Sequence, residues 1–185
     1  MKIYIKNMVC DRCKMAVESQ LKQLGFTPVV VKLGEIEIKE SELGSKKEQL
    51  INNLYQLGFE LLENDKKAFV QQIKALIIEH IQQDHILRYN LSDYLAKQSG
   101  KSYAYISSVF KEVEGYTLEK YYIRQRIERV KELLSYAELN LNEIAYKLHY
   151  SSVAHLSTQF KQITGMSPTA YKKQNNHNRI PLDRV

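Results

Sequence analysis

The sequence has no long hydrophobic run and only two cysteines. Its longest apolar stretches, such as residues 75–78, are far shorter than the roughly 18 residues that indicate a membrane span. Residues 1–8 alternate polar and apolar side chains and therefore lack the apolar core of a signal peptide. These absences predict a cytoplasmic protein, and in that reducing compartment Cys10 and Cys13 are not expected to form a structural disulfide.

The excess positive charge of the sequence is confined to its second part. Hydrophobic residues make up 44% and charged residues 26%, which is typical of a soluble globular protein. Residues 1–65 contain 9 Lys/Arg and 10 Asp/Glu, whereas residues 66–185 contain 18 and 11, so net charges of −1 and +7 sum to the formal +6. An excess of cations in one part favours a polyanionic partner. A basic, solvated surface would give the same asymmetry, so charge alone does not identify the partner.

The first 65 residues are predicted to form a small α+β domain with the order β-α-β-β-α-β. Alternating side chains indicate strands, helical spacing indicates helices, and Gly25 and Gly34 mark a helix end and a hairpin turn. The expected strands cover residues 2–6, 28–33, 35–39 and 59–63, and the expected helices cover residues 13–24 and 45–58. Met15 belongs to the apolar stripe of the first helix, and Ser45 and Glu48 have the spacing of a capping box that starts the second.

The rest of the chain is predicted to be all-α. Residues 64–67 are the only polar break between the two parts and contain neither Pro nor Gly, so the connection should be short. Apolar residues from Phe69 to Ile81 follow helical spacing over residues 67–83. The expected units are domains at residues 1–65 and 66–174 and a flexible tail at residues 175–185.

Two segments of the second part, residues 91–115 and 141–165, are similar to each other. Each contains a short helix, a turn of small or polar residues and a second helix, as in a helix-turn-helix unit whose second helix enters the major groove of DNA. The matching pairs lie 50 positions apart and are Ile106/Leu156, Ser107/Ser157, Ser108/Thr158, Phe110/Phe160, Lys111/Lys161 and Gly115/Gly165. The repeat alone is also compatible with two helical hairpins that have no role in DNA binding.

Motifs within and after the two units resemble the AraC/XylS family of transcription regulators. They are Gly115-Tyr116-Thr117-Leu118, Asn142-Glu143-Ile144-Ala145, His155-Leu156-Ser157, Phe160-Lys161 and Gly165-Met166-Ser167-Pro168-Thr169-Ala170-Tyr171. The resemblance covers residues 75–173 and is densest in its second half. It implies seven helices, with a long helix over residues 118–137 that lets both units reach successive major grooves on one face of the duplex.

The resemblance also implies which side chains face the bases of DNA. This set is Ala104, Ser107, Ser108, Ala154, Ser157 and Thr158. None of them is Arg, Asn or Gln, the residues that make bidentate base contacts, so direct readout should be modest. Tyr103 is added to the same face, and Tyr105, Gln159, DNA shape or a partner subunit in a homodimer should contribute further specificity.

Phosphate contacts are expected from six side chains and from the amino-terminal ends of both recognition helices, and they fix the register without reading sequence. They are Lys101, Ser102, Lys111, Ser152, Lys161 and Lys172. His155 could approach a phosphate, although a histidine on a helix-packing surface is more often structural. Arg126 is expected to be a scaffold residue at the junction of the helices.

The segment Met8-Val9-Cys10-Asp11-Arg12-Cys13 lies between the first strand and the first helix. This spacing can bring both sulfurs to one point, and the helix amino terminus favours the thiolates. Two soft thiolates suit Cu(I) better than Zn(II), because a closed structural zinc site has four protein ligands. A redox dithiol has the same motif.

The motif and the β-α-β-β-α-β order resemble the heavy-metal-associated domain over residues 1–65, which implies a ferredoxin-like fold with the metal at an exposed loop. Two residues depart from that family: Asn7 replaces its usual Gly, and Arg12 replaces a small residue. Three interpretations stay open: metal sensing, thiol redox sensing, and a retained fold whose cysteines bind nothing.

The sequence therefore predicts a DNA-binding transcription regulator with a sensor or dimerisation domain at its amino terminus. Metal would act by changing the orientation of the two domains across residues 64–67. The sequence contains no nucleophile–base constellation, P-loop or dinucleotide fingerprint, so an enzyme is not expected. The competing interpretation is a metal-handling or thiol-redox protein whose helical part binds a protein partner.

Overall fold

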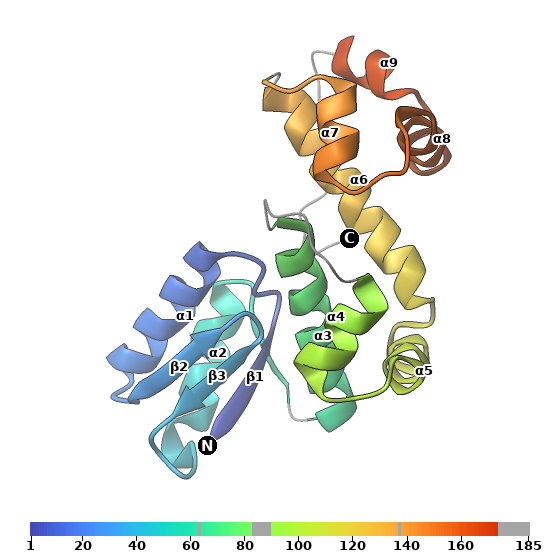
Figure 1. Ribbon diagram of the computed structural model, residues 1–185. Helices are drawn as coiled ribbons and strands as arrows, with labels where there is room; N and C mark the ends of the chain where they lie inside the picture. The colour runs from blue at the N-terminus through green and yellow to red at the C-terminus, as the bar shows by residue number, and fades with distance from the viewer. Residues whose placement is uncertain (63, 83–89, 137, 174–185) are drawn as a thin grey trace.

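The computed structural model describes residues 1–62, 64–82, 90–136 and 138–173, which form a small antiparallel sheet with two helices followed by a series of helices (Figure 1). In these segments no helix combines the length and the apolar character that crossing a membrane requires. Parts of the predicted elements at residues 63, 83 and 137, and the predicted tail at residues 175–185, lie outside the described residues.

The four strands form one sheet in the order β2-β3-β1-β4, with every neighbouring pair antiparallel. The strands are β1 (Lys2–Lys6), β2 (Pro28–Lys32), β3 (Glu35–Ile38) and β4 (Glu60–Leu62), and the helices between them are α1 (Asp11–Gln23) and α2 (Lys47–Gln56). The register pairs Ile3 with Ile36 and Ile5 with Leu61. These isoleucines are buried together with residues of both helices, which gives the first hydrophobic core.

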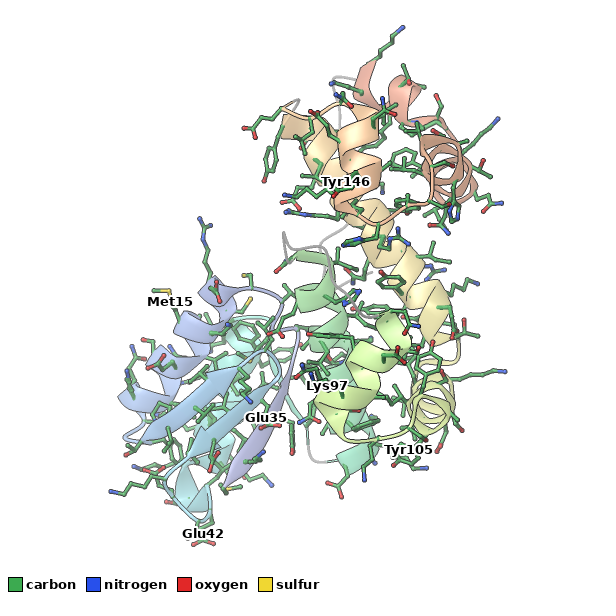
Figure 2. The ribbon with its side chains drawn as sticks, in the orientation of Figure 1. Met15, Glu35, Glu42, Lys97, Tyr105 and Tyr146 are labelled. Carbon is green, nitrogen blue, oxygen red and sulfur yellow. The ribbon has the colours of Figure 1, made fainter. Side chains whose placement is uncertain are left out.

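Two local predictions for this part of the chain are wrong. Met15 is 69% exposed and projects outward from α1, because the buried stripe of this helix runs through Val17 and Leu21 instead (Figure 2). The capping box at Ser45 and Glu48 is not formed. A 3-10 turn over Gly44–Lys46 precedes α2, so Ser45 lies inside that turn and Lys46 occupies the N-cap position without a side-chain hydrogen bond.

The helix α3 (Asp65–Gln82) follows the sheet almost directly. Asn64 caps it, because its side-chain oxygen accepts hydrogen bonds from the backbone N–H groups of Lys66 and Lys67 at 3.0 and 3.1 Å. The expected polar break is therefore the first turn of a helix. Ala75 of α3 belongs to the first core, whereas Ile73 and Ile77 belong to a second core formed with the next helices. One helix thus completes two hydrophobic cores.

Within the described residues the helical part contains seven helices, α3 to α9, the number that the sequence resemblance implies. Those after α3 are α4 (Leu91–Ser99), α5 (Tyr103–Glu114), α6 (Leu118–Tyr136), α7 (Leu141–Lys147), α8 (Val153–Thr164) and α9 (Pro168–Lys173). The second core joins α3, α4, α5 and the start of α6, and a third joins the rest of α6 with α7, α8 and α9. The long helix α6 connects these two bodies (Figure 1).

Candidate nucleic-acid interface

The helices α5 and α8 begin and end in the same way. Ser102 caps α5 by accepting the backbone N–H of Tyr105 at 3.3 Å, and Ser152 caps α8 by accepting the backbone N–H of His155 at 3.1 Å. Gly115 and Gly165 end the two helices in the left-handed conformation that glycine tolerates best. In each cap the serine oxygen accepts a bond, which leaves the hydroxyl proton free to be donated to a phosphate.

Each of these helices buries one face and exposes the other. Ile106 and Phe110 of α5 are fully buried, as are Leu156 and Phe160 of α8. The opposite positions, three and four residues apart, are solvent-exposed and carry small or cationic side chains. The exposed set is Ala104, Ser108 and Lys111 on α5 and Ala154, Thr158 and Lys161 on α8. Ser107 and Ser157 are half-buried at the edge of the same faces, and the hydroxyl oxygen of Ser107 is itself buried.

The two tyrosines at the start of α5 are placed differently. Tyr103 is half-buried, and its hydroxyl donates a 2.6 Å hydrogen bond to Glu119 of α6. Burial, together with this carboxylate, raises the pKa of Tyr103 to about 12. The Tyr103 hydroxyl is therefore engaged with α6, next to the half-buried Ser107. Tyr105 is 47% exposed at the outer side of α5, where Lys101 lies over its ring at 5.8 Å (Figure 2).

In the second unit, Gln159 and His155 already have partners within the protein. Gln159 accepts a 2.8 Å hydrogen bond from the Tyr150 hydroxyl, so its amide oxygen is already engaged. The His155 ring contacts the Ser151 hydroxyl at 3.0 Å and lies edge-on to Tyr150 at 5.4 Å. His155 is exposed but held in place, which agrees with a structural role. The predicted phosphate contacts Lys101, Lys111, Lys161 and Lys172 are all exposed.

Both α5 and α8 lie on the same side of the molecule and are seen nearly end-on in Figure 1, one in each body. The connecting helix α6 has 19 residues, and at 1.5 Å per residue it is about 28 Å long. Successive major grooves on one face of a duplex are about 34 Å apart. The arrangement is therefore of the right order for two helices that enter neighbouring grooves.

Arg126 of α6 fixes the position of the second unit. Its side chain is 9% exposed and donates a hydrogen bond to the Leu148 carbonyl in the turn between α7 and α8. The guanidinium also lies 3.7 Å from the centre of the Tyr150 ring and 5.3 Å from that of Tyr122. This contact with rings of both bodies confirms the scaffold role expected from the sequence.

Ion pairs between α3 and the end of α5 were not anticipated from the sequence. Lys66 pairs with Glu112 at 2.5 Å, and Lys74 pairs with Glu114 at 2.8 Å. The Nζ of Lys74 also lies 5.2 Å from the centre of the Tyr121 ring. Lysines of α3 thus neutralise carboxylates on the recognition helix, which reduces their repulsion of a nucleic acid. A separation of 40 or more residues gives no local signal for such pairs.

The cysteines lie at the turn into α1, as the sequence suggests. Their sulfurs are 3.4 Å apart, both side chains are half-buried, and Cys10 is the N-cap residue. Burial raises the pKa of the Cys13 thiol above its ordinary value, and hydrogen bonds from the turn backbone only partly oppose this effect. For Cys13 desolvation therefore outweighs the backbone hydrogen bonds of the turn, which favour the thiolate.

The structure explains why Asn7 can replace the Gly that is usual in the heavy-metal-associated domain. It also shows which side chains near the cysteines could bind a metal ion. Asn7 has a φ of 72°, a left-handed conformation that Asn tolerates better than most side chains, and its amide donates to the Gly58 carbonyl at 2.9 Å. Arg12 is exposed. Across the described segments there is no group of three or more His, Cys, Asp or Glu side chains that could hold a metal ion. The cysteines would thus act as a pair.

Comparison with known proteins relates the helical part to DNA-binding regulators. Residues 95–174 match the family model described as a helix-turn-helix domain. The Msm operon regulatory protein of Streptococcus mutans is 28% identical over 140 residues, which cover 70% of this chain and 49% of that protein. The probable transcriptional regulator LumQ of Photobacterium leiognathi is 26% identical over 149 residues, which cover 79% of this chain and 59% of that protein.

A solved structure supports the fold of the same region. The C-terminal domain of AraT, a response regulator from Geobacillus stearothermophilus, aligns with a TM-score of 0.50 and 25% identity over 62% of this chain and 97% of that domain. The chain spans about half the length of the curated relatives described above. These relatives are named as regulators, in keeping with the expectation that the chain is not an enzyme.

Proposed function

We propose that this chain, whose residues 95–174 match a helix-turn-helix domain, is an AraC-type transcription regulator that binds double-stranded DNA through α5 and α8. The observation that carries this proposal is the matched construction of these two helices. Both have a capping serine, a buried aromatic face and an exposed face of small and cationic residues, and both lie on one side of α6. The resemblance to the named regulators supports it.

The side chains of the interface favour binding that depends more on phosphates than on bases. Lys111 and Lys161 occupy equivalent exposed positions on α5 and α8, and the capping serines Ser102 and Ser152 can donate to the backbone of the duplex. The base-facing positions offer hydroxyl and methyl groups, which discriminate poorly between base pairs. Tyr105 is the large exposed side chain of α5 and is the best candidate for an added base or sugar contact.

The test measures the salt dependence of binding to a mixed-sequence duplex. Each phosphate contact contributes about −0.9 to the slope of log affinity against log salt, so Lys111→Gln/Lys161→Gln should make the slope shallower by about 2. The control variant Lys32→Gln/Lys39→Gln removes the same charge from exposed positions of the first domain and should leave the slope unchanged. Absence of duplex binding by the wild type at low salt would remove the proposal.

For the first domain we propose a ferredoxin-like fold of the heavy-metal-associated type, with Cys10 and Cys13 as a site for a soft monovalent ion such as Cu(I). The strand order β2-β3-β1-β4 supports the fold. The sulfur separation of 3.4 Å supports the site, because two sulfurs this close can each approach one ion to the usual metal–sulfur distance of about 2.3 Å. A bound cation would supply positive charge at the turn into α1.

This second proposal is tested by titrating Cu(I) and Zn(II) into the wild type and into Cys10→Ala/Cys13→Ala while duplex affinity is measured. We expect Cu(I) to change the affinity of the wild type but not that of the double variant. Met15→Leu, which removes an exposed sulfur two residues from Cys13, should respond as the wild type does. Equal affinities in every sample would leave the cysteines without a metal-sensing role.

A further inference from the structure

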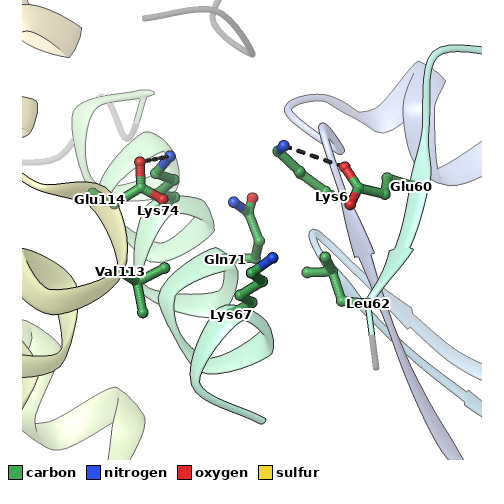
Figure 3. Close-up of a pocket in the computed structure, with 8 residues that line it drawn as sticks. All are labelled: Lys6, Glu60, Leu62, Lys67, Gln71, Lys74, Val113 and Glu114. Carbon is green, nitrogen blue, oxygen red and sulfur yellow. Dashed lines mark hydrogen bonds and ion pairs between the residues drawn. The ribbon is translucent and has the colours of Figure 1, made fainter. Parts of the chain in front are cut away.

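A cleft separates the sheet from the first helix-turn-helix unit, and Figure 3 shows the residues that line it. One wall is formed by β1 and β4, which contribute Lys6, Glu60 and Leu62. The other is formed by α3 and the end of α5. The cavity has a volume of about 270 Å³. We propose that this cleft binds a small organic oxyanion, a short-chain carboxylate or phosphate ester, as an effector.

One of the three lysines that line the cleft has no carboxylate partner among the described residues. Two of its three lysines are already paired with carboxylates, Lys6 with Glu60 at 3.2 Å and Lys74 with Glu114 at 2.8 Å. For Lys67, the third lysine, the described residues provide no carboxylate within ion-pair distance. The lining thus holds three cations against two anions, and its net positive charge favours an anionic ligand.

A neutral donor lies beside the unpaired lysine. The Gln71 amide reaches from α3 into the space between the two walls, and the Lys67 ammonium lies next to it (Figure 3). An amide N–H and an ammonium separated by one helical turn can both donate to the oxygens of a single carboxylate or phosphate group. Lys6 faces them from β1 across the cleft and would approach the same anion.

The lining of the cleft is mainly polar, and two of its residues are apolar. Leu62 of β4 and Val113 of α5 contribute apolar surface from opposite sides. The volume of about 270 Å³ lies just below the range of about 300–1,000 Å³ that is usual for small-molecule sites, so the ligand must be small. A short hydrocarbon segment between Leu62 and Val113 with its anionic group at Lys67 fits both the shape and the chemistry.

Beside the cleft, α3 approaches the sheet closely. A Cβ atom added at Gly34 would stand 3.6 Å from the backbone oxygen of Gln71, so the turn between β2 and β3 is in contact with α3. Glu35 accepts hydrogen bonds from Lys2 and from the Gln72 side chain at the same contact. The sheet and α3 are therefore in direct contact beside the cleft.

A regulatory consequence rests on the proposed DNA-binding function. The ligand would contact β1 and β4 on one side and the end of the recognition helix α5 on the other. It would therefore bind the arrangement in which these walls are close more tightly than one in which they have moved apart, and this difference in affinity is what couples a ligand to an output. Occupancy of the cleft should thus change the affinity of α5 for DNA.

The test is calorimetric titration of the full chain with short mono- and dicarboxylates, glycerol phosphate and inorganic phosphate in the absence of DNA. We expect one-to-one binding of at least one organic anion, and a loss of affinity of about tenfold or more in Lys67→Gln and in Gln71→Leu, the size expected for a charge-assisted hydrogen bond. Lys66→Gln removes a neighbouring charge outside the cleft and should bind as the wild type does.

The proposal is overturned if no organic anion binds, if Lys67→Gln binds as tightly as the wild type, or if inorganic phosphate binds as well as every organic anion. Because the titration contains no DNA, its failure leaves the proposed function untouched. Conversely, duplex binding measured without any organic anion tests the proposed function alone. The two results can therefore be separated in the same preparation of protein.

Discussion

Arg126 is buried where the two helix-turn-helix bodies meet, and it contacts a backbone carbonyl and two aromatic rings at once. A lysine could supply the charge at this position but not the flat guanidinium that stacks on Tyr150. We expect Arg126→Lys to lower the free energy of unfolding by about 1–3 kcal/mol, as for a buried group that loses its partner. Urea denaturation measures this loss. Arg124→Lys, on the same helix with only a 5.4 Å contact to Tyr116, should change stability by less than about 0.5 kcal/mol.

His80 lies nearby, buried between Tyr94 and Tyr122 at ring distances of 4.8 and 5.9 Å. Burial, together with His149 and Arg126, lowers the pKa of His80 to about 4 from 6.5. The folded protein therefore binds this proton less readily than the unfolded chain does. Its contribution to stability is complete above pH 6.5 and is lost as the pH falls toward 4.

We expect the free energy of unfolding to decrease by about 1–2 kcal/mol between pH 7 and pH 5 through His80 alone. His80→Phe keeps the aromatic packing but removes the imidazole that binds a proton. The free energy of unfolding of this variant should therefore vary less between pH 7 and pH 5. His155→Gln, which removes an exposed histidine, should retain the slope of the wild type. If the free energy of unfolding depended on pH equally in the wild type and in His80→Phe, His80 would not be the cause of this pH dependence.

The sequence predicted which residues of α5 and α8 are exposed, but it did not predict the tertiary contacts of individual side chains. Helical spacing was enough to put Ala104, Ser108 and Lys111 on one face, because the period of a helix is fixed. The hydrogen bond of Tyr103 was not predictable, because its acceptor Glu119 is 16 positions away on another helix. The burial that raises the pKa of Cys13 likewise depends on tertiary packing, which a local motif does not contain.

At the scale of the element, two capping boxes illustrate the same limit. Ser45 and Glu48 have the favoured spacing but do not cap, because a 3-10 turn occupies their segment. Asn140 and Glu143 were not identified from the sequence but form a reciprocal box, with hydrogen bonds of 3.1 and 2.7 Å between side chain and backbone at the start of α7. Spacing alone does not fix the residue at which a helix begins.

These two sites form a matched pair for mutation. Asn140→Ala should lower the free energy of unfolding by about 1 kcal/mol, because it leaves backbone N–H groups of α7 without their acceptor. Ser45→Ala should change it by less than about 0.5 kcal/mol, since its hydroxyl caps nothing. Chemical denaturation of both variants measures the difference. A larger loss for Ser45→Ala than for Asn140→Ala would show that the caps are assigned to the wrong sites.

At the scale of the molecule, the order of the elements and the presence of two repeated units were predictable, because alternation and helical periodicity are properties of local sequence. The contact between the sheet and α3 was not, since the residues that make it lie far apart in the chain. Glu35 and Gln72 meet across this contact, and Lys74 links α3 to Glu114. Of these residues, Lys74 and Glu114 line the cleft.

The shared helix α3 predicts cooperative unfolding of the sheet with the first helix-turn-helix unit. Ile73 is fully buried in the second core, and Ile73→Ala should cost about 2–5 kcal/mol. Because the same helix contributes Ala75 to the first core, amide hydrogen exchange should quicken in β1 and β3 as well as in α4 and α5. Unchanged protection in the sheet, with lost protection in α4 and α5, would mean that the two bodies open independently.

Because α3 completes two cores, the first 65 residues are not a freely exchangeable module. A recombination that replaced them with an unrelated sensor would leave Ala75 and Gln72 of α3 facing a surface for which they were not selected. The incoming sensor would have to provide both an apolar surface that packs against Ala75 and a hydrogen-bond acceptor for the Gln72 amide. Descendants of this protein should therefore inherit the sheet and α3 together, and changes on one side of their contact should be followed by compensating changes on the other.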